Sequence, residues 1–284
     1  MMRKIDIVLL SKHGDRKFTA DARFIENETA KPVIIFNHGF KGFKDWGPFD
    51  LLSEEFANAG FVFIKMNFSH NGTTPDNPYD FADLEAFARN NFCIELDDTG
   101  VLIDHLLLEG TPIPKKELDL SRIFNIGHSR GGAHAILKAK EDSRIKAVVT
   151  WAAVNNLESW HSKEEIDHWK KVGRIFIHNS RTNQDMPLDF QLVENFTANR
   201  ERLQVPEAVK NMSIPMLSIH GTDDPTVPVN AVKEIGSWNP NVLIEIIEGA
   251  GHAFGGTHPF TGVTLPDDLK KVRDLTIEFL KRIG

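Results

Sequence analysis

Short segments of continuously apolar residues recur along the chain, and they constrain the fold more than any other feature. The run 32–36 (PVIIF) shows no alternation of apolar and polar residues. Strands buried on both faces of a parallel sheet have such runs. Strands are predicted at 32–36, 61–66, 122–126, 145–151, 216–220 and 242–247, and helices lie between or after them at 51–59, 92–108, 133–140 and 266–283. This order predicts an α/β fold with a mostly parallel central sheet flanked by helices.

Two further segments shape the expected domain. Residues 5–10 and 17–25 alternate and predict an antiparallel hairpin before the parallel series. The connection 154–214 is far longer than a crossover requires, and it contains a hairpin-like piece at 174–188. We expect one domain over 1–284, with 154–214 as a cap or lid insertion over the carboxyl edge of the sheet.

The segment 127–131 (GHSRG) fits the nucleophile-elbow pattern G-x-S-x-G. In this pattern the serine occupies a strained turn between a strand and a helix, so the positions two before and two after it need to be nearly free of side chain. The context agrees, because 122–126 predicts a strand and 133–140 a helix. The hydroxyl would then lie at a helix N-terminus, which favours developing negative charge. We therefore predict Ser129 as a nucleophile.

A serine hydroxyl needs a base to remove its proton and an acid to orient that base. Asp223 and Asp224 follow the strand 216–220, and His252 follows the strand 242–247. The carboxyl ends of parallel strands share one edge of the sheet, and Ser129 is expected at the same edge. The order serine, acid, histidine also fits an elbow serine. His252 is thus the predicted base, and Asp223 or Asp224 the acid.

Three segments together resemble the α/β-hydrolase superfamily: 127–132 (GHSRGG), 220–228 (HGTDDPTVP) and 251–252 (GH). The branch they resemble contains dienelactone hydrolases, prolyl-oligopeptidase-type catalytic domains and cinnamoyl (feruloyl) esterases. The similarity runs from about residue 31 to the carboxyl terminus and is weakest across 154–214. It implies that the acid is Asp224, three residues before Val227, with Asp223 as the alternative. Dienelactone hydrolases carry a cysteine nucleophile, so the serine here argues against their substrate.

The resemblance also implies an oxyanion hole made of two backbone N–H groups. One belongs to Arg130, which directly follows the serine. The other is expected in the loop after the strand 32–36, where His38-Gly39-Phe40 resembles the His-Gly-aromatic segment of the family, and Phe40 is the predicted donor. Losing one such donor typically costs about 10²–10³-fold in rate.

Several other residues are candidates for substrate contact. Ser69 and His70 follow the strand 61–66, in a loop that often borders the pocket in this superfamily. Trp151 and Trp160 are expected either in an apolar pocket or in the core between cap and sheet. Arg181, together with Arg130, could recognise a substrate carboxylate, although the surrounding NSRT sequence also suits a tight turn.

Composition excludes several classes of function. The net charge of −7 argues against nucleic acid or an anionic membrane as a partner. The sequence contains no run of 18 apolar residues, so no membrane span is predicted. A single cysteine permits no internal disulfide and no cysteine-based zinc site. The histidines of 154–214 fit no standard metal-ligand spacing. We expect a cytoplasmic protein that uses neither metal nor cofactor and whose partner is a small-molecule ester.

These observations predict a serine hydrolase that cleaves a carboxylic ester through an acyl-Ser129 intermediate. The same triad would serve a peptidase, an acyl-peptide hydrolase or a thioesterase. The competing interpretation from another class is a non-catalytic binding protein with a hydrolase-like fold, which would be expected to lose a member of the triad. Substrate identity, the preference among ester, peptide and thioester, the oligomeric state and the geometry of the cap are not encoded in these motifs.

Overall fold

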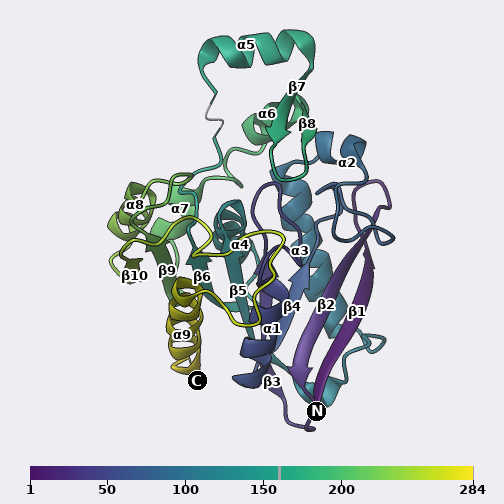
Figure 1. Cartoon of the computed structure of the whole chain (residues 1–284), viewed down its shortest axis with the longest axis vertical. Helices are drawn as coiled ribbons and strands as arrows, with labels where there is room; N and C mark the ends of the chain where they lie inside the picture. Colours follow the sequence, from purple (N-terminus) through teal and green to yellow (C-terminus); the bar gives the residue numbers. More distant parts are fainter. Residues whose placement is uncertain (159–160, 284) are drawn as a thin grey trace.

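A mixed eight-stranded sheet forms the centre of the protein in the computed structural model, which describes residues 1–158 and 161–283 (Figure 1). Its strands are β1 (Met2–Leu10), β2 (Lys17–Ile25), β3 (Lys31–Asn37), β4 (Val62–Met66), β5 (Leu118–His128), β6 (Ile145–Trp151), β9 (Met216–Gly221) and β10 (Val242–Ile247). They lie in the order β1-β2-β4-β3-β5-β6-β9-β10. β2 is antiparallel to β1 and β4, and the other neighbours are parallel. The predicted N-terminal hairpin and parallel series are confirmed.

Helices cover both faces of this sheet. One face packs against α1 (Phe49–Asn58) and α9 (Asp267–Lys281). The other packs against α3 (Phe92–Leu107), α4 (Arg130–Glu141), α7 (Val205–Lys210) and α8 (Asn230–Trp238). The shorter α2 (Leu84–Ala88) and a 3₁₀ turn at Lys115–Glu117 lie in connections. Within the described part of the chain, no helix combines the length and apolar character needed to cross a membrane.

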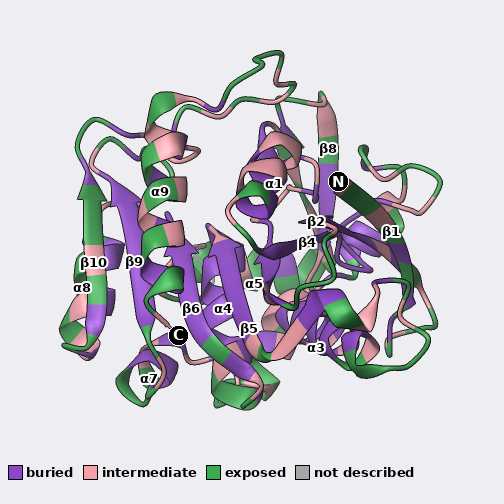
Figure 2. Ribbon diagram, turned by 90° about the horizontal axis from the view of Figure 1, so that it is seen from below, coloured by how far each residue is buried: buried purple, intermediate pink, exposed green. Residues whose placement is uncertain are grey.

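The central strand β3 shows why the apolar runs do not alternate. Val33 and Ile35 face the α3–α4 layer, whereas Ile34 and Phe36 face the α1–α9 layer. All four side chains are fully or almost fully buried, so both faces of the strand are dry. Figure 2 shows the inner strands buried between helices, while the edge strand β10 carries exposed residues. The core therefore consists of two apolar layers, one on each side of the sheet.

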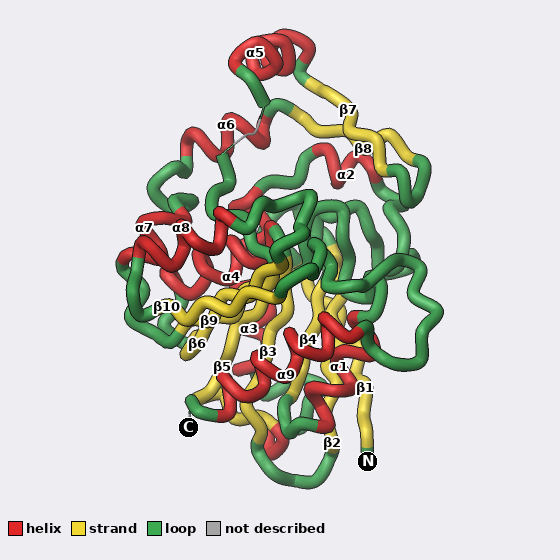
Figure 3. Tube along the Cα trace, turned by 60° about the vertical axis from the view of Figure 1, so that its left-hand side comes forward, coloured by secondary structure: helices red, strands yellow, loops and turns green. Residues whose placement is uncertain are grey.

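Between β6 and β9 the chain forms a structure above the body, near the carboxyl ends of the parallel strands (Figure 3). It contains α5 (Lys163–Val172), the antiparallel pair β7 (Arg174–Asn179) and β8 (Gln184–Asp189), and α6 (Gln191–Ala198). The hairpin-like piece predicted at 174–188 is thus a hairpin. α7, although it lies inside 154–214, packs on α4 and α8 at the flank of the sheet. The part of 154–214 above the sheet edge is therefore α5 to α6, and a cap or lid insertion with the bounds 154–214 stays a prediction.

Three local features order this cap. Ser162 and Glu165 form a reciprocal capping box at the start of α5. Trp169 is the buried anchor of the same helix, and its indole N–H donates to the carbonyl of Leu188 over 3.0 Å. Arg174, at the start of β7, pairs with Glu85 of α2 and with Asp189 of β8. The hairpin is therefore tied to the body through α2.

Candidate active site

Ser129 lies between the end of β5 and the start of α4, as the elbow motif predicts. Its backbone adopts φ 57° and ψ −122°, in a region that non-glycine residues rarely occupy. The Ser129 N–H donates to the carbonyl of Trp151 over 2.8 Å and ties the turn to the end of β6. A strained turn at this point directs the serine out of the sheet edge.

The glycines of the motif are required by close backbone contacts. A Cβ on Gly127 would lie 1.9 Å from the carbonyl oxygen of Gly131. A Cβ on Gly131 would lie 2.2 Å from the carbonyl oxygen of Asn37 in β3. Any side chain at either position would push α4 away from the sheet. The spacing of the pentapeptide therefore follows from how tightly the strand turns into the helix.

Asp224 and His252 lie in hydrogen-bond contact at the same edge of the sheet. The Nδ1 of His252 is 2.7 Å from Oδ2 of Asp224. Because an ionised carboxylate only accepts, Nδ1 carries the proton and Nε2 is left as the acceptor. Asp223 instead is exposed and accepts from the hydroxyl of Thr222. Of the two acids left open by the sequence, Asp224 is thus the one that contacts His252.

The surroundings of Asp224 keep its carboxylate ionised. Burial alone would raise the pKa, but hydrogen bonds from His220, His252 and the backbone N–H of Val227 outweigh it and hold the pKa of Asp224 well below its usual range. Oδ1 accepts from the N–H groups of Thr226 and Val227, each over 2.8 Å. These bonds fix the carboxylate with Oδ2 directed at the imidazole.

Two further contacts hold the loop that carries His252. The Nε2 of His128 donates to the carbonyl of His252 over 2.8 Å. Burial, with the neighbouring His252, lowers the pKa of His128 to about 3, so this imidazole is neutral and keeps a fixed tautomer. A Cβ on Gly221 would lie 2.0 Å from the carbonyl oxygen of Ala250. Because glycine has no Cβ, the two loops can touch at this point. His128 is therefore a structural neighbour of the base.

Ser129 and His252 line one cavity of about 1480 Å³ between the sheet edge and the cap. The cap contributes Phe176 and Ile177 of β7 to its wall, and the loop after β3 contributes Phe40 and Trp46. The wall therefore combines apolar and aromatic side chains with polar and charged ones, as sites for small molecules do. The cavity is large enough for a substrate well beyond a short acyl ester.

Both predicted oxyanion residues lie at this cavity. Arg130 is the first residue of α4, where backbone N–H groups have no partner within the helix. Phe40 follows Gly39, and a Cβ on Gly39 would lie 2.9 Å from Cβ of Ser129. The absence of that atom lets the Phe40 loop approach the serine. The two predicted donors are therefore on segments that meet at Ser129.

The side chain of Arg130 contacts neighbouring residues of the protein itself. Its Nη2 donates to Oε1 of Glu95, a buried residue of α3, over 2.5 Å. The guanidinium also lies over the rings of Phe40 and Phe92, 4.6 Å and 5.7 Å from their centroids. Glu95 thus holds one nitrogen of the guanidinium, and because Arg130 also lines the cavity, its recognition of a substrate carboxylate stays a prediction.

Three of the predicted substrate contacts lie away from the cavity. Ser69 and His70 are buried and hydrogen-bonded to each other over 2.7 Å, and Asp98 accepts from the N–H of Ser69. Trp151 is a core residue, 1% exposed, which packs on Phe36 and donates to the hydroxyl of Thr276. None of the three is among the residues that line the cavity, so the expected contact of Ser69 and His70 with substrate has no support, and of the two places expected for Trp151 the structure shows the core.

The remaining candidates have different outcomes. Arg181, in the turn between β7 and β8, lines the cavity. Trp160 lies outside the described residues. Sequence reasoning did not single out Lys41, which lines the cavity next to Phe40, or Glu95, which holds Arg130. Lys41 could have been found from the sequence, because it directly follows the predicted donor Phe40. Nothing in the sequence points to Glu95, because its partner Arg130 is 35 residues away.

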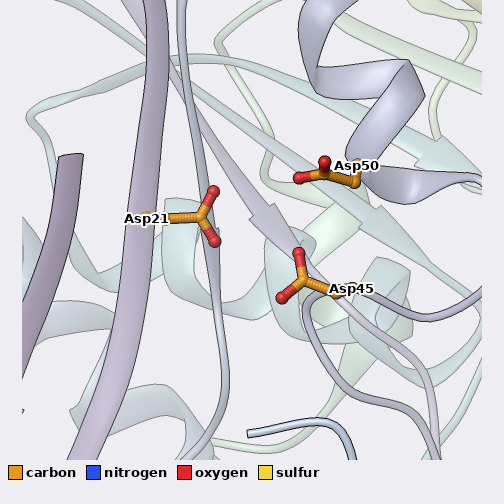
Figure 4. A group of neighbouring side chains, drawn as sticks. All are labelled: Asp21, Asp45 and Asp50. Atoms are coloured by element: carbon orange, nitrogen blue, oxygen red, sulfur yellow. The ribbon is translucent and has the colours of Figure 1, made fainter. Parts of the chain in front are cut away.

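Three carboxylates outside the cavity also approach one another, and they are the one grouping in the described residues with ligand-like spacing. Asp21 of β2, Asp45 and Asp50 at the start of α1 direct carboxylate oxygens that lie within 4.8 Å of one another (Figure 4). Lys44 and Lys65 place their ammonium groups among these oxygens, 2.6 Å from Asp21 and 2.8 Å from Asp50. Arg23 and Lys4 also pair with Asp50, over 2.7 Å and 3.3 Å, so cationic side chains supply the positive charge here and the group is an ion-pair cluster of the fold.

Comparison with known proteins gives likeness in structure alone. The sequence matches no known family model, and no curated protein matches it. The esterase domain of a Rhodothermus marinus protein superimposes with a TM-score of 0.68 at 17% identity, covering 100% of both chains. Est1E from Butyrivibrio proteoclasticus gives 0.67 at 17% identity, covering 97% of this chain and 98% of that one.

A peptidase has the same architecture. The acylaminoacyl peptidase of Pyrococcus horikoshii gives a TM-score of 0.65 at 17% identity, covering 99% of this chain and 41% of that one. The sheet order, the elbow at Ser129 and these likenesses together identify the chain as a protein of the α/β-hydrolase fold.

Proposed function

We propose that the protein is a serine hydrolase that cleaves a carboxylic ester by way of an acyl-Ser129 intermediate. The observation that carries the proposal is the 2.7 Å hydrogen bond from buried Asp224 to His252, which lines the same cavity as Ser129. The strained backbone of Ser129 at the start of α4 supports the same assignment. The proposal includes the branch suggested by the motifs, that of dienelactone hydrolases, oligopeptidase-type domains and feruloyl esterases.

The reaction follows from the tautomer of His252. Its Nε2 takes the proton of the Ser129 hydroxyl as the oxygen attacks the ester carbonyl, and Asp224 stabilises the imidazolium that forms. The carbonyl oxygen becomes an oxyanion that the N–H groups of Arg130 and Phe40 stabilise. His252 returns the proton to the leaving alcohol, which departs and leaves the acyl group on Ser129. Water, deprotonated by His252, then releases the acid and restores the serine.

A fluorophosphonate probe tests the nucleophile. The chain offers a matched pair of variants, because Ser69 also hydrogen-bonds a histidine but is buried outside the cavity. Native protein and Ser69→Ala should label at one site, and Ser129→Ala should not label. Labelling that persists in Ser129→Ala, or native protein that does not label while folded by circular dichroism, would contradict the assignment.

A substrate panel tests the bond. We expect 4-nitrophenyl and aryl carboxylic esters to be hydrolysed with a kcat/KM well above that of matched 4-nitroanilides and thioesters, because a reactive ester needs less stabilisation of its leaving group. If the anilides are hydrolysed faster than every ester, the protein is a peptidase and the assignment as an esterase is wrong. Activity that is abolished by a chelator and restored by a metal ion would contradict a mechanism carried by the triad.

A further inference from the structure

The charged residues on the wall of the cavity fall into two kinds. Glu158 forms an ion pair with Arg200 over 3.0 Å, whereas Glu234 accepts from the neutral amide of Asn155 and keeps its charge. Among the cations of the wall, Arg130 is held by Glu95. Lys41 and Arg181 differ from Arg130, because neither forms an ion pair within the described residues. Among the described residues, the cavity wall thus presents two unpaired positive charges, Lys41 and Arg181, and one unpaired negative charge, Glu234.

Lys41 and Arg181 are held next to each other across the junction of cap and body. The Nη2 of Arg181 donates to the carbonyl of Lys41 over 3.1 Å, and its guanidinium lies 5.3 Å from the ring centroid of Trp46. The ammonium of Lys41 lies 5.9 Å from the centroid of Phe40. These contacts orient both cations from the two sides of the cavity mouth without neutralising them.

Two like charges held side by side repel each other, even where the side chains are partly exposed, as Lys41 and Arg181 are. Burial and the neighbouring Arg181 lower the pKa of Lys41, and burial lowers the pKa of Arg181. An anion bound between them would relieve the repulsion and would gain charge-assisted hydrogen bonds from the free donors of the guanidinium. A neutral substrate would leave the repulsion in place.

We propose that Lys41 and Arg181 form an anion subsite, and that the preferred substrates are esters carrying a carboxylate or a phosphate away from the scissile bond. This inference rests on the proposed function, because it assigns a specificity to the cavity of Ser129. Lys41 and Arg181 line the same cavity as Ser129, so an anion bound between them occupies the space in which the ester would react. The planar guanidinium of Arg181 suits either anion, and these share the same chemistry of recognition.

Matched esters test the subsite. Mono-4-nitrophenyl esters of dicarboxylic acids, from adipate to sebacate, are compared with the same compounds capped as methyl esters, and kcat/KM is measured for each. At the best chain length we expect the anionic ester to exceed its capped partner by about tenfold. The ratio should decline towards one in high salt, because the cations lie at an open mouth and are screened. A phosphonate in place of the carboxylate identifies which anion the site prefers.

Variants assign the effect to the two residues. In Lys41→Met/Arg181→Met the ratio of anionic to capped ester should fall to about one, whereas Lys171→Met, an exposed lysine of α5 outside the cavity, should keep the native ratio. A general loss of folding would lower both rates together and leave the ratio unchanged. A native ratio near one at every chain length, or a ratio that survives in the double variant, would overturn the subsite.

A binding experiment separates this inference from the proposed function. Titration of Ser129→Ala with monomethyl suberate and with dimethyl suberate requires no turnover. Tighter binding of the anionic compound, lost in the triple variant that also carries Lys41→Met and Arg181→Met, supports the subsite even where no ester is cleaved. Equal binding of the two compounds contradicts it, whether or not Ser129 reacts with a fluorophosphonate.

Discussion

Arg130, the residue after the predicted nucleophile, is hydrogen-bonded at 2.5 Å to Glu95 of α3, whose side chain is almost completely buried. Burial would raise the pKa of Glu95, but Arg130 and His134 lower it to about 2, so the carboxylate is ionised at neutral pH. Because the same guanidinium lies over Phe40, one buried carboxylate orders both segments predicted to form the oxyanion hole. Glu95 is therefore a positioning residue that does not touch the cavity itself.

Replacing Glu95 with glutamine should damage catalysis beyond its effect on folding. The amide keeps the shape of the side chain but leaves the Arg130 charge without its partner, so we expect the free energy of unfolding to fall by about 2–3 kcal/mol. The released guanidinium lets the Phe40 loop shift, and kcat should fall about tenfold with little change in KM. Urea unfolding and ester hydrolysis measure the two effects.

A control for Glu95→Gln is Glu207→Gln, which breaks the exposed pair with Lys210. That change should cost no more than about 0.5 kcal/mol and leave kcat unaltered. A Glu95→Gln protein with native kcat would show that the Arg130–Glu95 bond serves stability alone.

Gly39→Ala should disturb the nucleophile directly. The added Cβ would lie 2.9 Å from Cβ of Ser129 and 3.2 Å from the carbonyl oxygen of His128, so the Phe40 loop has to move. We expect the rate constant for fluorophosphonate labelling to fall at least about tenfold, since small displacements of reacting groups have large effects. Gly110→Ala is the matched control, because its Cβ would meet open space. If Gly39→Ala is labelled with the native rate constant, the position of the Phe40 loop does not affect the reactivity of Ser129.

The fold could be predicted from local patterns, whereas the wall of the cavity could not. In an apolar run such as 32–36, each residue is apolar because the strand is buried on both faces, so the run itself reveals the burial. The roles of Trp151 and Arg181 depend on which element packs over them. Trp151 is apolar and its carbonyl accepts from the N–H of Ser129, yet α9 covers its side chain through Thr276. Arg181 reaches the cavity only because the β7–β8 turn contacts Lys41, 140 residues away.

Asp98 should make the protein less stable as the pH rises. Burial raises its pKa from 3.8 to about 6, even though Ser11 and the N–H of Ser69 donate to it. Asp98 therefore binds its proton more tightly in the folded state than in the unfolded state. The contribution of this proton to the free energy of unfolding is lost as the pH rises from about 4 through about 6. The loss should amount to about 2–3 kcal/mol at neutral pH.

Asp98→Asn isolates this effect, because an amide can accept from Ser69 and donate to Ser11 without ionising. The variant should match the native protein in urea unfolding at about pH 4 and exceed it at about pH 7. Equal differences in unfolding free energy at both pH values would mean that Asp98 does not titrate in this range.

Asp224→Asn and Asp223→Asn distinguish the two acids that the sequence left open. In Asp224→Asn, the N–H groups of Thr226 and Val227 would retain the amide oxygen, which turns the amide NH₂ towards His252. The imidazole would then have to accept at Nδ1 and carry its proton on Nε2, the wrong tautomer for a base. An asparagine in this role in a serine protease costs about 10⁴-fold in kcat, and we expect a loss of about 10³–10⁴-fold. Asp223→Asn, at an exposed position, should stay within about twofold of native kcat. Comparable losses in both variants would show that the carboxylates act together, because the hydrogen bond to His252 predicts an effect of Asp224 alone.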